Sequence, residues 1–263
     1  MLELYHNDMS TCSQKVRLTL AEKELPWQGH HMNLRRGDTR TQEYQQLNPG
    51  AVVPTLIDDG EIVCESTVIM EYLDDAYPEP AVRPSSPEGR ARMRGWLKQL
   101  DEDLHASVAT ISGAVAFRYQ TLEGRSEAEL IEHINKIPNP VKRASNLDVT
   151  LNGTDSKNFA PAIKRWDKVF ADMEIALKQD PWLTGERYSL ADAAYTPYLV
   201  RMDHLQFLGF LDSRPKLADW YERVKARPNF VGGITEWLNE KYLPLMAEKG
   251  GEEWPKVKRI LAE

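Results

Sequence analysis

The chain has 263 residues, of which 41% are hydrophobic and 28% charged, and its formal net charge is −7. This length suits two domains, and no apolar run approaches the roughly 20 residues that a membrane-spanning helix needs. The short basic stretches lie among carboxylates, which argues against nucleic acid or an anionic membrane surface as the main partner.

Targeting and metal-binding signals are missing from the sequence as we interpret it. The strand-like start shows neither a basic n-region nor an apolar h-region, which predicts a cytoplasmic protein. Cys12 and Cys64 form no C-x-x-C pair and no disulfide framework. His30 and His31 are neighbours in a predicted strand, so their rings point to opposite faces. We therefore expect no metal.

Strand and helix signals alternate over the first 80 residues. The expected elements are a strand at 2–5, a helix at 11–25, a strand at 26–34, a helix at 39–47, a strand pair at 55–65 and a helix at 66–77. The strand pair surrounds Asp59-Gly60, a strong hairpin signal. This βαβαββα order predicts a small α/β domain over residues 1–80.

The rest of the chain is predicted to be helical after a proline-rich linker at 81–87, which belongs to a stretch with four prolines between Pro78 and Pro87. The expected all-α domain covers 88–263, and its helices are 88–111, 126–137, 160–179, 189–208, 215–228 and a last one around 234–246. We expect residues 138–159 to form a long loop.

The octapeptide DMSTCSQK lies where the first predicted helix begins. Thr11 and Gln14 have the spacing of a capping box, which places Cys12 and Ser13 in the first turn. A helix N-terminus favours anions and lowers the pKa of a thiol from about 8.5. The cluster around Ser10 and Cys12 therefore either forms or stabilises a thiolate, or it is a helix cap with a small buried cysteine.

Two further segments carry polar or special backbone signals. Val53-Pro54 precedes a predicted strand, where a cis-proline turn exposes a backbone edge, although an ordinary trans turn is the alternative. Ser66 is a natural N-cap for the next helix and has Glu65 beside it. Its hydroxyl and amide suit a carboxylate ligand and Glu65 suits an ammonium group, or the pair is only a cap.

Together these segments resemble the glutathione transferase family. The resemblance rests on YHNDMSTCSQKVRLTLAEKEL, LNPGAVVPTL and ESTVIMEYLDD in the first half and on GERYSLADAAYTPYLVRMDHLQFLG and RPKLADWYERVKARPNF in the second. Ser189 and Asp192 are similar to the capping box of the family's central helix. The resemblance implies a thioredoxin-like domain, an all-α domain, a homodimer and glutathione as co-substrate.

The resemblance also implies a role for each matching residue. Val53, beside a cis Pro54, pairs its backbone with the cysteinyl part of glutathione, and Glu65 with Ser66 holds the γ-glutamyl end. The segment Ser10–Ser13 faces the sulfur, with Ser10 and Ser13 as expected hydrogen-bonding partners and Cys12 as the competing candidate. Many relatives have Gln or Lys where this chain has Val52, which removes one polar contact.

Two subclasses match different parts of the chain. STCS is similar to zeta-class isomerases and to reductive dehalogenases, in which the cysteine, here Cys12, forms a mixed disulfide. VATISGAVAF and EHINKIPNP are similar to bacterial lignin β-etherases, which displace a phenol with glutathione. We expect β-aryl ether cleavage, with dehalogenation or isomerisation through Cys12 as the alternative. A non-catalytic glutathione-binding protein is the alternative of another class.

An apolar pocket for an aromatic electrophile is expected between the two domains. The candidate lining residues are Met9, Phe117, Tyr119, Asn135 and Tyr198. Aromatic residues at helical spacing more often belong to a core, and Asn135 is equally typical of a helix end.

Overall fold

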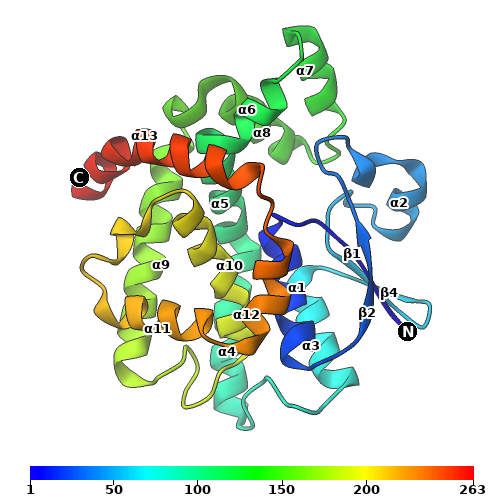
Figure 1. Ribbon diagram of the computed structural model, residues 1–263, viewed down its shortest axis with the longest axis vertical. Helices are drawn as coiled ribbons and strands as arrows, with labels where there is room; N and C mark the ends of the chain where they lie inside the picture. The colour runs from blue at the N-terminus through cyan, green and yellow to red at the C-terminus, as the bar shows by residue number, and fades with distance from the viewer.

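A computed structural model describes residues 1–263 and has an α/β half followed by a helical half (Figure 1). The elements of the first half are β1 (Leu2–His6), α1 (Thr11–Glu22), β2 (Trp27–His31), the 3₁₀ turn η1 (Asp38–Arg40), α2 (Gln42–Leu47), β3 (Thr55–Asp58), β4 (Glu61–Cys64) and α3 (Ser66–Ala76). The predicted βαβαββα order is therefore confirmed.

The four strands form one mixed sheet in the order β2-β1-β3-β4. β1 pairs in parallel with β2 and antiparallel with β3, so that Leu4 lies opposite Gly29 on one side and Leu56 on the other. Leu4 and Leu56 are fully buried, and helices α1 and α3 pack on each other beside the sheet (Figure 1). The β1–α1 connection thus delivers the start of α1 to one end of the sheet.

The predicted hairpin and proline turn are both present. Asp59 and Gly60 join β3 to β4 with φ angles of 47° and 94°, as a tight hairpin requires. The Val53–Pro54 peptide bond is cis, and the turn leads directly into β3. The hairpin follows from the Asp59-Gly60 sequence alone, because a left-handed backbone at both central positions favours these residues.

The second half is entirely helical (Figure 1). Its elements are α4 (Pro87–Gln99), the π-helical turn η2 (Leu100–Leu104), α5 (His105–Ser112), the π-helical turn η3 (Gly113–Phe117), α6 (Arg118–Leu122), α7 (Glu127–Asn135), α8 (Pro140–Asn152), η4 (Gly153–Asp155), α9 (Phe159–Gln179), α10 (Leu190–His204), η5 (Leu208–Leu211), α11 (Pro215–Lys225), α12 (Pro228–Gly233), η6 (Thr235–Trp237) and α13 (Tyr242–Ala262). The first of the expected helices thus continues beyond residue 111 to Leu122.

The long loop expected at residues 138–159 is wrong, because most of it is helix α8. The side chain of Asn139 accepts hydrogen bonds from the backbone N–H groups of Val141 at 2.9 Å and Lys142 at 3.0 Å. Pro140 occupies the first helical position, where a missing N–H costs nothing. Asn139-Pro140 here begins a helix, where the sequence analysis expected a loop.

The last helix is also misplaced in the sequence analysis. Residues 235–237 form only a 3₁₀ turn, and α13 runs from Tyr242 to Ala262 through Gly250 and Pro255. A Cβ atom on Gly250 would lie 1.9 Å from the carbonyl oxygen of Leu205. Gly250 is therefore the point at which α13 crosses the end of α10, and the glycine does not mark a helix end.

Helix α10 is the centre of the helical half and is buried along almost its whole length. Its predicted capping box is present, since Asp192 accepts from the Ser189 N–H at 3.0 Å. Asp192 also accepts from the Trp220 indole at 2.8 Å, which ties α10 to α11. No helix in the structure combines the length and the apolar character needed to cross a bilayer.

Candidate active site

Two buried arginines hold the loop that leads into α1. Arg17 donates to the carbonyl oxygens of Asn7 and Asp8, both at 2.9 Å, and Arg201 of α10 donates to the carbonyl oxygen of Met9. Both guanidinium groups are almost fully buried, and burial lowers the pKa of Arg17 to about 9. Because a buried guanidinium must keep its partners, this loop is fixed from both halves of the protein.

Helix α1 begins at Thr11 as predicted, but its N-cap is one residue earlier than the sequence analysis placed it. Ser10 is the N-cap, and its hydroxyl accepts from the Ser13 N–H at 3.2 Å. The capping box of Thr11 and Gln14 is therefore wrong, because both side chains lie inside the first turn and are buried. Cys12 still lies in the first turn, where the helix dipole favours a negative charge.

The thiol of Cys12 faces a histidine from the helical half. Its Sγ atom lies 3.4 Å from Nδ1 and 3.7 Å from Nε2 of His105, the first residue of α5. The hydroxyl of Tyr198 on α10 lies 3.4 Å from the same Nδ1. His105 directly follows the π-helical turn η2, a helix irregularity that is frequent at functional sites.

The charges around Cys12 favour its thiolate. Burial alone raises the pKa of the thiol, but the charges of His105 and Lys15 and hydrogen bonds from His105 and Ser66 outweigh this effect and lower the pKa to about 6. Burial has the opposite result for Tyr198, whose pKa is raised well above its usual value. Near pH 7 the site therefore combines an ionised thiol with a protonated phenol.

Lys15 is a fully buried cation on the same face of α1 as Cys12. Its ammonium group donates to the Ser66 hydroxyl at 3.3 Å and lies 5.2 Å from the centre of the Tyr198 ring. Neither group carries a formal negative charge. Because a buried ammonium needs a compensating anion, Lys15 stabilises a thiolate or an anionic ligand at this position.

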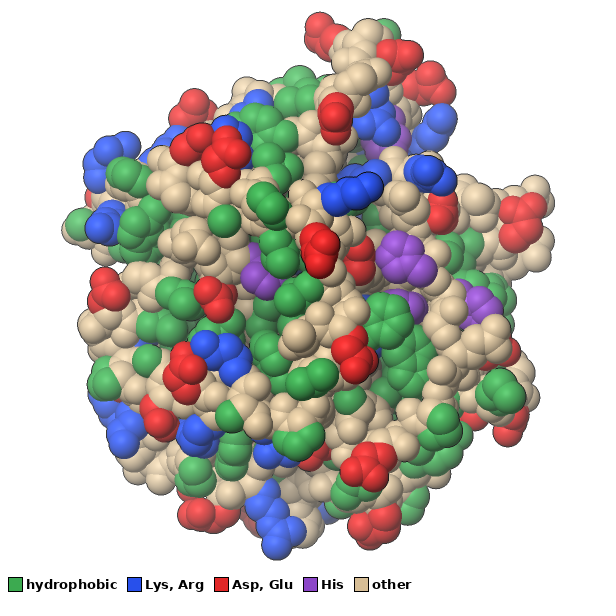
Figure 2. Space-filling model, viewed as in Figure 1, with side chains coloured by type: hydrophobic (Ala, Val, Ile, Leu, Met, Phe, Trp, Pro, Cys, Tyr) green, Lys and Arg blue, Asp and Glu red, His purple; other side chains and the backbone are tan.

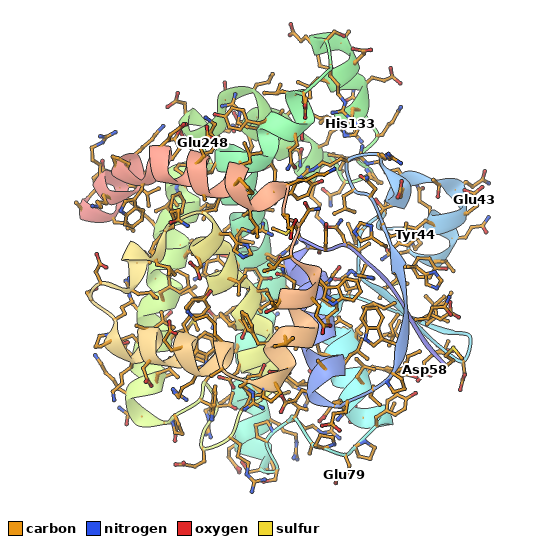
Figure 3. The ribbon with its side chains drawn as sticks, in the orientation of Figure 1. Glu43, Tyr44, Asp58, Glu79, His133 and Glu248 are labelled. Carbon is orange, nitrogen blue, oxygen red and sulfur yellow. The ribbon has the colours of Figure 1, made fainter.

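The Val53–Pro54 turn before β3 offers a free backbone edge. The N–H and C=O groups of Val53 make no hydrogen bond within the protein. The preceding carbonyl, that of Val52, is occupied instead by the Tyr44 hydroxyl at 2.7 Å and by Asn48 at 3.1 Å. Figure 3 shows Tyr44 between α2 and the sheet, where it braces the turn.

The start of α3 contacts Lys15 through Ser66. Glu65 has a left-handed φ of 68°, a strained conformation for a residue with a side chain, and it occupies the N-cap position without a capping hydrogen bond. Ser66 is the first helical residue, so its predicted role as N-cap is wrong. Thr67 donates to Asp101 of η2 at 2.6 Å, which joins this helix start to the helical half.

The comparisons with known proteins agree with this arrangement. Residues 4–81 match the family description "Glutathione S-transferase, N-terminal domain" and residues 132–223 match "Glutathione S-transferase, C-terminal domain". The chain is 31% identical to Protein LigF of a Sphingobium species, over 94% of this chain and 98% of that protein. The chain belongs to the glutathione S-transferase family.

Two other similar proteins carry the names of subclasses that the sequence resembles. The chain is 30% identical to a maleylacetoacetate isomerase of Pseudomonas aeruginosa over 87% of the chain and 93% of that protein. It is 26% identical to a tetrachloro-p-hydroquinone reductive dehalogenase of Sphingobium chlorophenolicum over 89% of this chain and 99% of that protein. The crystal structure of the β-etherase LigF superposes with a TM-score of 0.79 at 30% identity, covering 90% of this chain and 98% of that structure.

Some of the predicted site residues lie close to the Cys12 thiol, and the others lie further away. Cys12, Ser66 and Tyr198 meet around Lys15 and His105. Ser13 is fully buried, and its hydroxyl accepts from the Asn7 N–H at 3.2 Å.

The remaining pocket candidates lie further from the thiol. Met9 is buried, and the centre of the Phe117 ring lies 4.7 Å from the guanidinium group of Arg35 and 4.9 Å from that of Arg201. Tyr119 is 39% exposed and its ring lies 5.4 Å from the ammonium group of Lys249, while Asn135 is exposed at the end of α7.

The sequence analysis missed His105, Lys15 and Arg201. Lys15 is three residues after Cys12, a spacing that puts two side chains on one helix face, so this signal was available in the sequence. His105 is 93 residues away from Cys12, and only the tertiary fold brings the two side chains together. No local pattern distinguishes His105 from any other helix residue.

Proposed function

We propose that this protein is a glutathione transferase whose thiolate attacks an aromatic electrophile and that its net reaction cleaves a β-aryl ether. The observation that carries the proposal is the likeness to the β-etherase LigF, which extends over both halves of the chain. The charged cluster at the start of α1 supports it independently, because displacement of a phenol requires an ionised sulfur nucleophile.

Glutathione is proposed to bind along the edge that starts at Val53. The free N–H and C=O of this residue suit the backbone of an extended tripeptide, and Pro54 fixes the turn. Glu65 and Ser66 are proposed to hold the γ-glutamyl ammonium and carboxylate groups. The sulfur then lies near Cys12 at the start of α1.

The proposed reaction is a substitution at the ether carbon. The glutathione sulfur forms a bond to that carbon, the carbon–oxygen bond breaks, and its electron pair leaves on the phenolate oxygen. The proton released from the thiol neutralises the phenolate, so that the products are a thioether and a phenol. Lys15 and the helix dipole lower the energy of the thiolate, and the hydroxyl of Tyr198 contacts His105 at 3.4 Å.

The roles of the hydroxyl residues differ from the expectation in the sequence analysis. We assign Ser10 and Ser13 to holding the helix start, since Ser10 accepts from Ser13 N–H and Ser13 accepts from Asn7 N–H. Cys12 is then the side chain that faces the glutathione sulfur. For the electrophile we retain Met9, Phe117 and Tyr198 as pocket wall and propose Tyr119 and Asn135 as an outer rim.

A direct test uses a two-ring β-aryl ether with glutathione. Mass spectrometry should find the glutathione thioether and the released phenol in equal amounts, and Cys12→Ser should retain part of this activity. Release of no phenol at millimolar glutathione, from a protein that is thermally stabilised by glutathione, would contradict ether cleavage. The absence of any stabilisation by glutathione would instead favour a protein without a working glutathione site.

The second candidate function is thiol transfer through Cys12, as in a reductive dehalogenase. The lowered pKa of Cys12 and its contact with His105 favour it. In this reaction the Cys12 thiolate attacks the sulfur of a glutathione adduct, the carbon leaves with the electron pair and takes a proton, and a Cys12–glutathione disulfide remains. A second glutathione then reduces it. A mass increase of one glutathione on Cys12 during turnover, together with complete loss of activity in Cys12→Ser, would favour this reaction over direct substitution. A zeta-type isomerisation would give a product of unchanged mass.

The wider setting is proposed on family grounds. We propose a cytoplasmic homodimer that has neither nucleic acid nor a membrane as its partner, with a glutathione domain at 1–80, a linker at 81–87 and a helical domain at 88–263. Light scattering at several protein concentrations tests the dimer, and a monomer at micromolar concentration would contradict it.

A further inference from the structure

Three successive backbone N–H groups at the start of α1 have no acceptor in the protein. They belong to Ser10, Thr11 and Cys12, whereas the next one, that of Ser13, donates to the Ser10 hydroxyl at 3.2 Å. The first N–H groups of a helix have no partner inside it and suit an anion. A carbonyl oxygen becomes such an anion while its carbon is attacked, and preorganised N–H groups stabilise it. The start of α1 therefore offers an oxyanion hole beside the Cys12 thiol.

His105 faces the same thiol from the helical half of the protein. Its Nδ1 atom lies 3.4 Å from Sγ of Cys12, and the Tyr198 hydroxyl lies 3.4 Å from this Nδ1. An imidazole beside a thiol can deliver a proton to a leaving group and then take one from water. Substitution at an ether carbon and disulfide exchange need no base that activates water. A thiol, a histidine and an oxyanion hole together are the parts of an acyl-transfer centre.

Lys15 makes Cys12 a good leaving group in such a reaction. Its ammonium group is fully buried and has one acceptor, the Ser66 hydroxyl at 3.3 Å. Lys15 follows Cys12 by three residues, so both side chains lie on one face of α1. An acyl group on Cys12 would remove the negative charge of the thiolate and leave the buried ammonium without a counter-charge. Release of the acyl group restores that charge and is therefore favoured.

We propose that this site also hydrolyses glutathione thioesters, with Cys12 as the nucleophile and His105 as the acid and base. The inference rests on the glutathione site proposed above, because a glutathione sulfur held near the start of α1 brings an acyl group on that sulfur to Cys12. The substrate class is S-acylglutathione. An aromatic acyl group suits the pocket proposed for the electrophile.

The proposed reaction has two steps and consumes one water. The Cys12 thiolate forms a bond to the carbonyl carbon, the bond from this carbon to the glutathione sulfur breaks, and that sulfur leaves with the electron pair and takes a proton from His105. Neutral His105 then takes a proton from water as the water oxygen attacks the acyl carbon. The bond to Cys12 breaks with its electron pair on Sγ, which restores the thiolate. The products are a carboxylic acid, which ionises in solution, and glutathione.

The experiment supplies S-benzoylglutathione to the full-length protein without free glutathione. Benzoate and glutathione should appear in equal amounts, and mass spectrometry after rapid quenching should find one benzoyl group on Cys12. His105→Gln should still become acylated but should release benzoate roughly 100-fold more slowly, because general acid–base catalysis contributes at least this factor. The acylated form should therefore accumulate. Cys12→Ser should lose the hydrolysis while it retains part of the ether cleavage.

His31→Gln is the matched control and should keep the wild-type rate of benzoate release. The side chain of His31 is 49% exposed, and Figure 2 shows histidine side chains at the surface over the sheet. A rate that falls equally in His31→Gln and His105→Gln would contradict the role of His105. The benzoyl adduct in the wild type requires no variant, so it decides the nucleophile even if a substituted protein fails to fold.

The outcomes separate this inference from the proposed function. S-benzylglutathione has no carbonyl beside its sulfur, and thermal stabilisation by it reports binding alone. If it stabilises the protein but S-benzoylglutathione yields no benzoate, the inference is overturned and the glutathione site stands. Benzoate release at the wild-type rate in Cys12→Ser also overturns it. Thioester hydrolysis by a protein that cleaves no β-aryl ether would support the inference and contradict ether cleavage. The absence of any stabilisation would remove the glutathione site and both proposals with it.

Discussion

Replacement of His105 by glutamine should separate the thiolate of Cys12 from its principal stabiliser. The substitution keeps a hydrogen-bonding side chain but removes the charge that acts on the sulfur at 3.4 Å. In the wild type a pKa of about 6 leaves about nine tenths of the thiol ionised at pH 7. A return to the ordinary value of about 8.5 would leave about one thirtieth. The largest possible loss of thiolate is thus roughly thirtyfold, and because Lys15 remains we expect roughly tenfold.

The assay is the rate of alkylation of Cys12 by iodoacetamide as a function of pH. Thiolate forms as pH rises through the pKa, so the wild-type rate should rise with a midpoint near pH 6, and the midpoint of His105→Gln should lie higher. Burial raises the pKa of Cys64, so this second thiol reacts more slowly near neutral pH, and Cys12→Ser identifies its contribution. His31→Gln changes an exposed histidine away from Cys12 and is the matched control.

An unchanged midpoint in His105→Gln would refute this explanation. It would mean that Lys15 and the helix N-terminus alone lower the pKa of the thiol. A midpoint that rises equally in His31→Gln would point to a general electrostatic effect and would also contradict the contact described here.

Three further substitutions test other parts of the structure. Lys15→Met should raise the alkylation midpoint of Cys12 and lower the free energy of unfolding in urea by about 3 kcal/mol, because the ionised Cys12 loses its buried partner cation; an unchanged stability would contradict this pairing. Asp192→Ala should lower the free energy of unfolding in urea by about 3 kcal/mol, because the Ser189 and Trp220 donors lose their acceptor. Asp192→Asn keeps one of the two acceptor oxygens and should lower it less. An equal loss in both variants would contradict a role for the oxygen that asparagine keeps. Ser66→Ala should raise KM for glutathione roughly fivefold with a smaller change in kcat; an unchanged KM would remove Ser66 from the glutathione site.

The first half of the fold could be predicted because its signals are local. Asp59-Gly60 specifies a hairpin through its own φ preferences, and the apolar spacing specifies α1 and α3 whatever surrounds them. The cap of α1 was placed one residue too late, because Ser10 and Thr11 carry equivalent hydroxyl groups. The choice between them is made by Arg17 and Arg201, which fix the preceding carbonyls through contacts that no local pattern contains.

The second half was harder to predict for the same reason. Asn-Pro at 139–140 signals a helix start or a break, and only the hydrogen bonds to Asn139 and the packing of Val149 against Gly113 decide for the helix. The candidate site divides in the same manner. Cys12 could be predicted from its helix start, whereas its partner His105 comes from a turn of irregular helix 93 residues later.

Three buried cations surround the start of α1, and their different partners explain why Cys12 is more than a small core residue. Arg17 donates to three backbone carbonyls, and Arg201 donates to the Met9 carbonyl and the Ser112 hydroxyl. Lys15 has only one hydroxyl acceptor, which leaves part of its charge uncompensated in a buried environment. The ionised thiol of Cys12 supplies that compensation in the free protein, and a bound thiolate would supply it in the complex. A cysteine that only filled space would leave Lys15 without a counter-charge, and this is the physical reason for proposing the first turn of α1 as the reactive centre.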